Sequence, residues 1–395
     1  MKRGIDMNRV GIDKIGFYTP PIYLDMTDLA HARGDEPAKY TIGIGQDQMA
    51  VTPISQDIIS MAVNAGLQII NDEDRSKIDL VIVGTESAFD ASKSSAVYVH
   101  ELLNIQPHAR SFEIKHACYA ATAGLQMAKD YVTLHPDRKA LVIGTDVARY
   151  GLATGGEVTQ GAGAMALLVS ADPTVLILEK DSAYTTKDIM DFWRPVYSEY
   201  AMVDGKYSNE QYLSFFNTVW NLYKEKTNRS IADIKAFSFH LPYTKMGKKA
   251  LQEVLPEADD AKQKALSAIF EESLAFNRLV GNIYTGSLYL NLLSLLENGK
   301  GLKAGDRIGL FSYGSGAVGE FFTGLLAEDF KKGLASDKYT ELLAKRQQVT
   351  VAEYEAMFTQ NLPEDGSALT IDAANDSSAC RLVEVKDHKR SYIVK

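Results

Sequence analysis

Only two cysteines, Cys118 and Cys380, occur among the 395 residues of the sequence. Two cysteines cannot build a disulfide framework, a cysteine-rich zinc site or an iron–sulfur cluster, so we expect no metal. The chain also lacks the run of roughly 18 apolar residues that a membrane-spanning helix requires. Residues 1–20 contain no uninterrupted apolar stretch of the kind that secretory signals carry. We therefore expect a cytoplasmic protein without a membrane segment.

An excess of positive charge is lacking as well. The sequence has 42 Lys and Arg residues against 51 Asp and Glu, which gives a net charge of −9, and both signs are interspersed along it. A nucleic-acid partner is not expected, because binding phosphates requires a basic stripe. Apolar residues, in contrast, make up 46% of the chain. This is enough to bury a large core in two domains or in one duplicated fold.

Short apolar runs alternate with helix-like segments, which is typical of a largely parallel sheet covered by helices. We predict helices that begin at Thr52-Pro53 and that span 94–103, and a glycine-rich connection between residues 145 and 164. Strands are predicted at 10–15, 79–84, 111–115, 139–145, 164–170, 234–239 and 307–312. Glycine-rich stretches precede both AMALLVS and AVGEFFTGL, which favours a duplicated α/β unit. We place its two halves at 1–172 and 173–395.

Three chemically capable residues, Glu86, Cys118 and His240, each follow an apolar strand run. In open α/β sheets, ligands gather at the carboxyl ends of the strands, so these side chains are expected to converge. Each also has an ordinary structural explanation. A lone cysteine is usually a small buried hydrophobe, a carboxylate at a strand end is often a cap, and a buried histidine often only completes a hydrogen-bond network.

The position of Cys118 favours a nucleophile, because a strand gives way there to a helix of small residues, Ala120-Ala121-Thr122-Ala123-Gly124. We expect free amides and the helix dipole to stabilise its thiolate. Cys380 has no such context and is predicted to be structural. If Glu86 faces an apolar pocket, desolvation raises its pKa and suits it to proton transfer.

The run from Gly314 to Gly319 matches the G-x-G-x-x-G dinucleotide fingerprint, but strand-like residues rather than a helix follow it. A tight turn that offers backbone amides to an oxyanion is the better interpretation. Farther upstream, Lys245, Lys248 and Lys249 form a basic cluster. It is either a solvated helix face or a local contact for the phosphates of coenzyme A, since screening confines charge effects to about 8 Å.

Together these residues resemble the hydroxymethylglutaryl-coenzyme A synthase family in its bacterial form. The resemblance extends from about residue 11 to 325 and implies a thiolase-like duplicated fold, with five α-β-α-β-α layers, that works as a homodimer. It is carried by IGIGQ at 42–46, TES at 85–87, ACYAAT at 117–122, DFWRP at 191–195, FHLP at 239–242, GNIYTGS at 281–287 and SYGSG at 312–316.

The resemblance implies that the protein condenses acetyl-CoA with acetoacetyl-CoA and water in the mevalonate pathway, with these thioesters as substrates and no further cofactor. Cys118 would carry the acetyl group, and Glu86 would act as general acid and base. His240 and Asn282 would position the second substrate, while backbone amides of Cys118 and Ser315 would form an oxyanion hole. Other family positions that would line or support the pocket are Tyr119, Asp146, Tyr150 and Asp191. Lys245 and Lys249 remain a candidate coenzyme A contact because of their charge.

Three alternatives remain at this point. A ketoacyl synthase III-type condensing enzyme also uses Cys, His and Asn but does not need Glu86. A thioester hydrolase would pair Cys118 directly with His240 and join no carbons, and an acyl-binding protein would need no nucleophile. One departure from the family is His116, two positions before Cys118, which either alters the pKa of the thiol or faces away.

Overall fold

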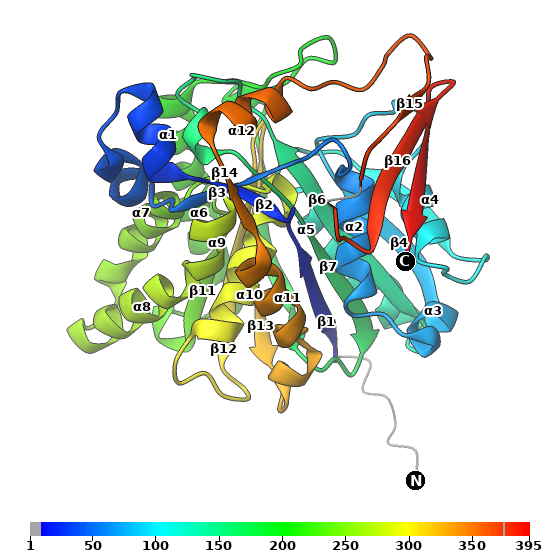
Figure 1. Cartoon of the computed structure of the whole chain (residues 1–395). Helices are drawn as coiled ribbons and strands as arrows, with labels where there is room; N and C mark the ends of the chain where they lie inside the picture. The colour runs from blue at the N-terminus through cyan, green and yellow to red at the C-terminus, as the bar shows by residue number, and fades with distance from the viewer. Residues whose placement is uncertain (1–8, 374–375) are drawn as a thin grey trace.

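A nine-stranded sheet runs through the centre of the computed structural model, which describes residues 9–373 and 376–395 (Figure 1). Its strand order is β11-β12-β13-β8-β1-β7-β6-β4-β5. The first half of the chain supplies β1 (Val10–Tyr18), β4 (Ile78–Gly84), β5 (Arg110–Ile114), β6 (Lys139–Ala148) and β7 (Gly161–Ala171). The second half supplies β8 (Leu176–Thr186), β11 (Ala236–Phe239), β12 (Arg307–Gly314) and β13 (Val318–Leu326).

The strand connections of the first half recur in the second. β4 pairs in parallel with β6, and β6 pairs antiparallel with β7. In the same way β11 pairs in parallel with β12, and β12 pairs antiparallel with β13. The two sets join where β1 meets β8 through the pairs Gly11–Ile177 and Ile12–Leu176. A Cβ at Gly11 would lie 2.0 Å from the carbonyl oxygen of Leu176, so only glycine fits this seam.

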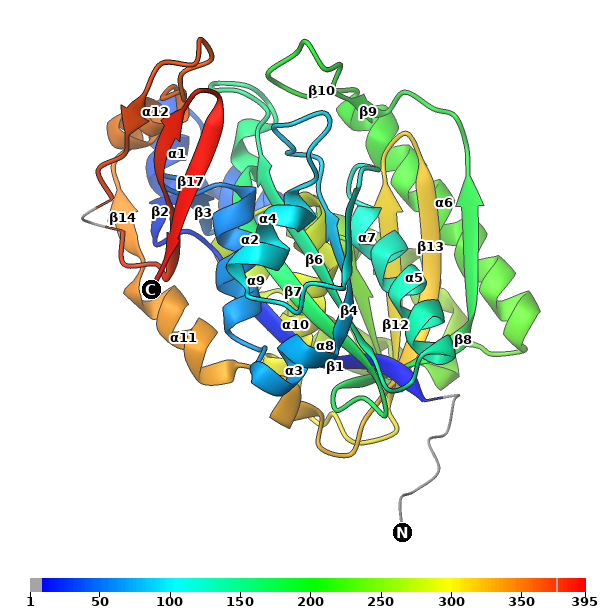
Figure 2. The same ribbon diagram turned by 90° about the vertical axis from the view of Figure 1, so that its right-hand side faces the viewer.

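Helices cover the outer faces of the sheet and fill the space between its halves. α2 (Ile58–Leu67) packs on β1, β6 and β7, and α6 (Gly205–Thr227) packs on β8 and β13. Between them, α5 (Ala120–Leu134) lies against β4 and also reaches β12 through a hydrogen bond of 2.8 Å from Thr122 to Ser312 (Figure 2). The chain therefore has the mixed α/β fold of the thiolase type.

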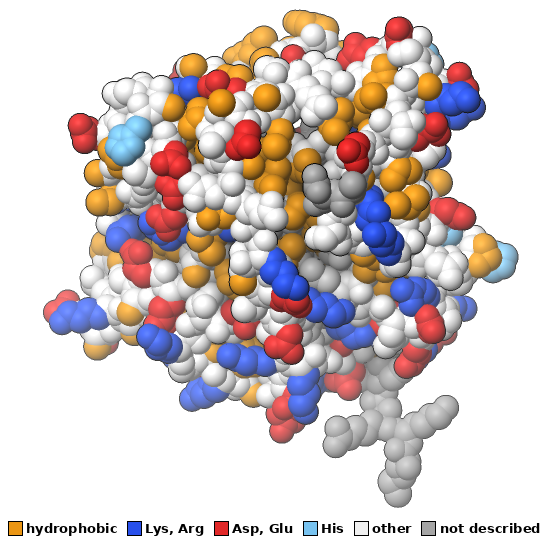
Figure 3. Space-filling model, viewed as in Figure 1, with side chains coloured by type: hydrophobic (Ala, Val, Ile, Leu, Met, Phe, Trp, Pro, Cys, Tyr) orange, Lys and Arg blue, Asp and Glu red, His pale blue; other side chains and the backbone are white. Residues whose placement is uncertain are grey.

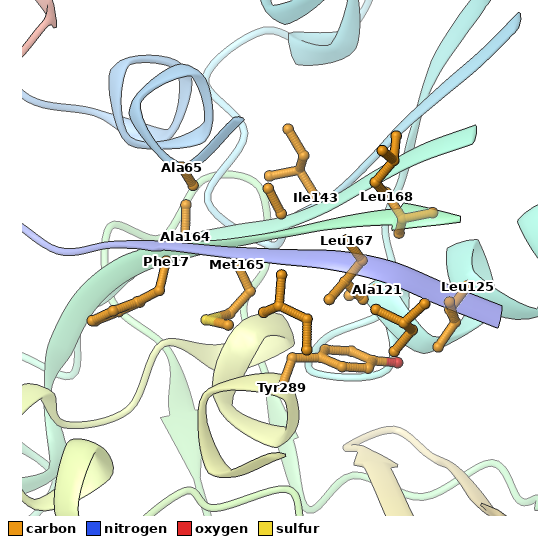
Figure 4. Packing of buried hydrophobic residues seen from close by; sticks show 14 of the residues in the cluster. Phe17, Ala65, Ala121, Leu125, Ile143, Ala164, Met165, Leu167, Leu168 and Tyr289 are labelled. Carbon is orange, nitrogen blue, oxygen red and sulfur yellow. The ribbon is translucent and has the colours of Figure 1, made fainter. Parts of the chain in front are cut away.

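The core at the centre is tightly packed around small side chains. In Figure 4, Ala121 and Leu125 of α5 approach Met165 and Leu167 of β7 from one side. Tyr289 of α10 (Ser287–Asn298) reaches the same cluster, and its hydroxyl lies 2.9 Å from Thr122 Oγ1. Because α5 carries Ala and Gly on its buried face, it approaches the sheet closely. This close approach fixes the position of Cys118, two residues before the helix begins.

The structure confirms all seven predicted strands and the helix predicted at 94–103, which is α4 (Ser95–Leu102). The helix start predicted at Thr52-Pro53 is wrong. The chain first completes β3 (Gln48–Val51), and α2 begins after Asp57, whose side chain accepts the amides of Ile59 and Ser60. A carboxylate that satisfies two orphan amides makes a stronger helix start than a Thr-Pro pair.

The strand predicted to begin at 164 begins earlier, because Gly161-Ala162-Gly163 already belongs to β7. Gly161 passes directly under the segment that carries Asn282. A Cβ there would lie 2.6 Å from the carbonyl oxygen of Val280 and 2.7 Å from that of Asn282. The glycines thus allow a strand to run close beneath another backbone.

Chain segments from both ends form a cap above the sheet (Figure 1). It contains α1 (Met26–Arg33), α12 (Val351–Phe358) and the small sheet β14-β2-β3, in which β14 (Gln347–Val349) pairs with β2 (Ile22–Asp25). Beside them stands the antiparallel hairpin of β16 (Cys380–Lys386) and β17 (Lys389–Val394). Within the described ranges, no helix is both long and apolar enough to cross a bilayer.

Candidate active site

Glu86 and Cys118 meet at the carboxyl end of the first half of the sheet. Glu86 follows β4, and Cys118 lies between β5, the parallel neighbour of β4, and α5. The thiol of Cys118 donates to Oε1 of Glu86 over 3.4 Å. The convergence predicted for these two side chains is therefore confirmed by the structure.

The backbone around Cys118 forms a tight turn that lies against the second half. Ala117 has a positive φ of 37°, and the amide of Tyr119 donates to the carbonyl of His116 over 3.0 Å. Gly314, at the end of β12, packs so closely that a Cβ there would lie 2.7 Å from the nitrogen of Tyr119. The turn that contains Ser315 is thus held beside the nucleophile. It connects β12 and β13 in a hairpin, as the strand-like residues after Gly314 indicated.

Asp146, at the end of β6, fixes the loop that carries Glu86. Its Oδ1 accepts from the amide of Glu86 at 2.9 Å and from the hydroxyls of Thr85 at 2.9 Å and Ser87 at 2.8 Å. Its Oδ2 accepts from the amide and hydroxyl of Thr285 at 3.1 and 2.8 Å. Five donors hold this buried carboxylate in one orientation, so Asp146 orients Glu86 and contributes negative charge beside it.

Burial and the neighbouring charge of Asp146 raise the pKa of Glu86 to about 8, against the opposing effects of the Cys118 thiol and Arg194. Arg194 also donates to the backbone carbonyl of Glu86. A carboxyl with such a pKa exchanges protons near neutral pH, as expected for a general acid and base.

The expectation of a stabilised thiolate at Cys118 is not met. Burial raises the pKa of the thiol well above its usual value, and the negative charges of Glu86 and Asp146 raise it further. The helix dipole of α5 is outweighed because two carboxylates on neighbouring strands face the same space. The thiol therefore needs an acceptor for its proton, and Glu86 is in contact with it.

His240 follows β11 in the second half and is almost fully buried, with 3% of its surface exposed. Its amide donates to the carbonyl of Phe311 at 2.8 Å, and its carbonyl accepts from the hydroxyl of Tyr212 at 2.6 Å. Among the described residues, Nδ1 of its ring has no partner. Burial lowers the pKa of His240 to about 3, so the imidazole is neutral and has a ring nitrogen available for a ligand.

Asn282 and Tyr150 form a second pair of hydrogen-bonded residues in the candidate site. Asn282 is buried, and its Oδ1 accepts from the amide of Tyr284 at 2.9 Å and the hydroxyl of Ser287 at 2.8 Å. Its amide nitrogen Nδ2 donates to the hydroxyl of Tyr150 over 3.4 Å. Burial raises the pKa of Tyr150, and the charges of Cys118 and Glu86 add to the shift, which places its hydroxyl near the reacting residues.

Tyr119 and Asp191 use their polar groups on protein partners. The Tyr119 hydroxyl donates to Oε2 of Glu320 at 2.6 Å. Asp191 is buried and accepts from the Tyr313 hydroxyl and the Gly316 amide, both at 2.8 Å. The two side chains thereby brace the Cys118 turn and the β12–β13 turn.

The three lysines predicted as a cluster do not share the same interactions. Lys248 pairs with Glu271 at 2.5 Å, whereas Lys249 approaches the Tyr243 hydroxyl at 3.4 Å. Lys245 and Lys249 are one helical turn apart on α7 (Thr244–Val254) and share a face. The start of α7 is tied to the other half of the chain, because the Thr244 hydroxyl donates to the carbonyl of Gly45 at 2.6 Å.

The ring of His116 hydrogen-bonds to the backbone of Gly314, and its Nε2 is buried with no partner among the described residues. Burial lowers its pKa, and its ring meets that of Tyr119 edge-on at 6.1 Å. His116 thus joins the contacts that hold the end of β12 against the Cys118 turn.

A cavity of about 650 Å³ lies beside the Glu86 loop, between that loop and the cap. Its wall includes Ser87 and Arg194, which flank Glu86, together with Arg149, Gln160 and residues of α12. Figure 3 shows hydrophobic side chains gathered on the upper part of this face, over the region between α12 and the β16–β17 hairpin.

Sequence reasoning did not select three residues that the structure places around the centre. Glu320 accepts from Tyr119, Arg194 contacts Glu86, and Gln160 accepts from the backbone amides of Tyr150 and Gly151. Arg194 lies within the DFWRP motif, so a signal for it was present. Glu320 acts on Tyr119, 201 positions away, and Gln160 acts on backbone amides rather than on a ligand, so no local pattern marks either residue.

Comparison with known proteins agrees with this geometry. The family models described as hydroxymethylglutaryl-coenzyme A synthase N terminal and C terminal match residues 7–174, and residues 176–271 and 258–366, respectively. The chain is 56% identical over 356 residues to a hydroxymethylglutaryl-CoA synthase of Enterococcus faecalis, covering 90% of this chain and 93% of that protein.

Solved structures give the same result. An HMG-CoA synthase complexed with CoA superposes with a TM-score of 0.95 at 44% identity, over 98% of this chain and all of that one. MvaS in complex with 3-hydroxy-3-methylglutaryl coenzyme A superposes with a TM-score of 0.87 at 36% identity, over 98% of this chain and 99% of that one.

Proposed function

The chain belongs to the hydroxymethylglutaryl-coenzyme A synthase family, and we propose that Cys118, Glu86 and His240 carry out its reaction. The enzyme condenses acetyl-CoA with acetoacetyl-CoA and water to 3-hydroxy-3-methylglutaryl-CoA and CoA, a step of the mevalonate pathway. The observation that carries the proposal is the contact between the thiol of Cys118 and the carboxyl of Glu86.

The first step is acetyl transfer to Cys118. The thiol gives its proton to Glu86, the sulfur attacks the thioester carbon of acetyl-CoA, and the leaving thiolate of CoA takes that proton from Glu86, which is then ionised again. Glu86 is the nearest proton acceptor in contact with the thiol, which matters because the pKa of the thiol is high. The amides of Cys118 and Ser315 are proposed to stabilise the oxyanion, supported by the close packing of Gly314 on the Cys118 turn.

The second step forms the carbon–carbon bond. Ionised Glu86 removes a proton from the methyl group of acetyl-Cys118, and the resulting carbanion attacks the ketone carbon of acetoacetyl-CoA. Neutral His240 and Asn282 polarise that ketone, and Glu86 returns the proton to the new alkoxide. Water then cleaves the thioester bond to Cys118, which releases the product and restores the thiol.

The remaining residues bind or support. We propose that Lys245 and Lys249 contact the phosphates of coenzyme A from their shared face of α7. Asp146 orients Glu86, and Tyr150 lines the pocket beside Asn282. Tyr119 and Asp191 hold the two turns that meet at the nucleophile. No cofactor beyond the CoA thioesters enters these steps.

We propose further that the halves are 1–172 and 173–395, that the enzyme acts as a homodimer, and that it works in the cytoplasm. The division is supported by the recurring strand order on either side of the β1–β8 seam. The dimer is supported by the position of β5 at the edge of the sheet and by Val196 and Tyr197, which are 101% and 86% exposed. Light scattering coupled to gel filtration tests the dimer.

One experiment separates this function from the alternatives. The protein is incubated with acetyl-CoA and acetoacetyl-CoA, and the product is identified by mass spectrometry. Formation of 3-hydroxy-3-methylglutaryl-CoA is expected. Free acetate as the sole product would indicate a hydrolase, although the thiol of Cys118 bonds to Glu86 rather than to a histidine. Condensation that proceeds only with a malonyl donor would indicate a ketoacyl synthase.

A further inference from the structure

Tyr150 is carried by a turn that lies between β6 and the 3₁₀ helix η2 (Glu157–Thr159), and helix α12 of the C-terminal cap holds this turn from two sides. α12 lies beyond residue 325, where the resemblance carried by the sequence motifs ends, but within the C-terminal family model, which matches to residue 366. Its contacts with the turn are buried and specific, and they end at a residue of the reaction centre.

The first tether passes through Gln160. Oε1 of this buried side chain accepts from the amide of Tyr150 at 2.7 Å and from that of Gly151 at 3.2 Å. Its Nε2 donates to the hydroxyl of Tyr354 on α12 at 2.9 Å. The side-chain amide of Gln160 is thus used at both ends, and its orientation depends on the Tyr354 hydroxyl.

Tyr354 is itself fixed by a buried ion pair. Its hydroxyl donates to Oε1 of Glu157 at 3.2 Å, and Glu157 receives two hydrogen bonds of 2.8 Å from Arg33. Glu157 also accepts from the amide of Ala153, in the turn after Tyr150. The hydroxyl therefore has one donor and one acceptor in place, which leaves it little freedom.

The second tether is Arg149, the residue before Tyr150. Its guanidinium donates to the carbonyl of Phe358 at the end of α12 and lies 4.3 Å from the centre of the Phe358 ring. Phe358 also stacks on Tyr200 at 5.9 Å. α12 therefore contacts Arg149 directly, and it holds the backbone amides of Tyr150 and Gly151 through Gln160.

The position of Tyr150 is therefore determined by the cap. The phenol ring meets the rings of Phe192 and Tyr284 edge-on, both at 6.0 Å, and its hydroxyl receives Nδ2 of Asn282. Asn282 depends on the same segment, because its backbone amide donates to the carbonyl of Thr159 at 3.1 Å. A shift of residues 149–160 would move both pocket residues together.

We propose that Tyr354, acting through Gln160, is a positioning residue for Tyr150, so that helix α12 of the cap sets the geometry in which the condensation takes place. This inference rests on the proposed function of the site. Tyr354 touches neither Cys118 nor Glu86 in any described contact, and its effect is exerted through backbone amides.

The test is a double-mutant cycle between Tyr354→Phe and Tyr150→Phe, with the rate of condensation as the readout. Tyr354→Phe removes one hydroxyl and keeps the shape of the ring. We expect it to lower kcat about three- to tenfold, the loss of one buried hydrogen bond, with KM for acetyl-CoA nearly unchanged. In the Tyr150→Phe background the same substitution should have no further effect, because the hydroxyl that it positions is already gone.

A matched control is Tyr339→Phe. Tyr339 is also a buried tyrosine of the C-terminal region, and its hydroxyl also bonds to a glutamate, Glu297. It lies on α11 (Ser336–Lys345), and none of its described contacts involves residues 149–160. This variant should lose stability comparably but keep kcat.

Several outcomes would overturn the inference. An equal fall in kcat in both backgrounds would mean that Tyr354 acts independently of Tyr150, and an equal fall in Tyr339→Phe would mean a general structural effect. If Tyr354→Phe does not fold, Arg149→Met replaces it in the same cycle with the same expectation. Failure of the proposed function is distinct, because then the wild-type protein itself would form no 3-hydroxy-3-methylglutaryl-CoA.

Discussion

Cys118 and Glu86 share a hydrogen bond, Sγ to Oε1 at 3.4 Å, although 32 positions separate them in the sequence. Parallel pairing of β4 with β5 brings them together, since Glu86 follows the first strand and Cys118 follows the second. In the proposed mechanism Cys118 carries the acyl group, and Glu86, which is in contact with it, transfers the proton. Most of the expectations for variants of this enzyme follow from that arrangement.

Replacing Glu86 should separate the two half-reactions. Glu86→Gln keeps the size and some hydrogen bonding of the side chain but cannot take a proton from the acetyl methyl group. We expect condensation to fall by roughly 10²- to 10⁴-fold, the usual contribution of general acid–base catalysis. Acetyl transfer to Cys118, followed by intact-protein mass spectrometry, should be slower, because Glu86 also accepts the thiol proton, but acetyl-Cys118 should still accumulate. A variant that condenses within about tenfold of the wild-type rate would place the base elsewhere.

Acetyl-CoA alone should label Cys118 and leave Cys380 unmodified. Cys380 is fully buried at the start of β16, where its backbone bonds to Asn64. Peptide mapping after incubation checks the site of labelling. Cys118→Ser should be almost inactive, because the serine hydroxyl is a poorer nucleophile than the thiol. Acetyl found on Cys380 would contradict the proposed intermediate.

The pH dependence of condensation should report the ionisation of Glu86. The carboxyl must be charged to remove the methyl proton, and its pKa is raised to about 8, so kcat should rise with pH through that value. Arg194→Met removes a cation that lowers this pKa, so the rise should move to higher pH. Asp146→Asn removes an anion that raises it, so the rise should move to lower pH.

These shifts are measured as kcat against pH for the three proteins. His240 makes no contribution to the profile in the working range, because its pKa of about 3 keeps it neutral throughout. A wild-type rate that does not change between about pH 6 and 9, or an Arg194 variant displaced to lower pH, would refute the assignment.

Removing the imidazole should affect the second substrate only. His240→Ala leaves a buried space after β11, and we expect a rise in KM for acetoacetyl-CoA and a loss of kcat of about 10²-fold. Acetylation of Cys118 in a single-turnover assay should stay close to the wild-type rate. Comparable losses in both half-reactions would instead indicate that His240 acts directly on the thiol.

Strand patterns were sufficient to predict that Glu86 and Cys118 meet, because polar side chains directly after apolar runs lie at one edge of a sheet. The same patterns misplaced the start of α2, since Thr52-Pro53 competes with a better capping carboxylate at Asp57. The pKa of Cys118 was predicted in the wrong direction for a related reason. Its local helix was visible in the sequence, but the charges of Glu86 and Asp146 reach it only through the tertiary fold.

The roles of Tyr119 and Asp191 show a second limit of sequence reasoning. Both were expected at the pocket, yet their hydroxyl and carboxyl groups bond to Glu320 and to the Tyr313–Gly316 turn. Gln160 gave no signal at all, because it acts on the amides of its neighbours rather than on a ligand. Residues that act through backbone groups become visible only when partners distant in sequence are placed together.

The position of β1 between β7 and β8 has a consequence for synthesis on the ribosome. β1 is the first described strand to be made, but both of its neighbours lie more than 140 residues downstream, in register with Tyr18–Ala164 and Gly11–Ile177. The nascent chain must therefore keep an apolar strand unpaired until residues 161–186 have left the exit tunnel. During that interval the apolar, unpaired β1 is exposed to nascent-chain chaperones. Slowing translation before residue 161 should therefore increase aggregation of this protein.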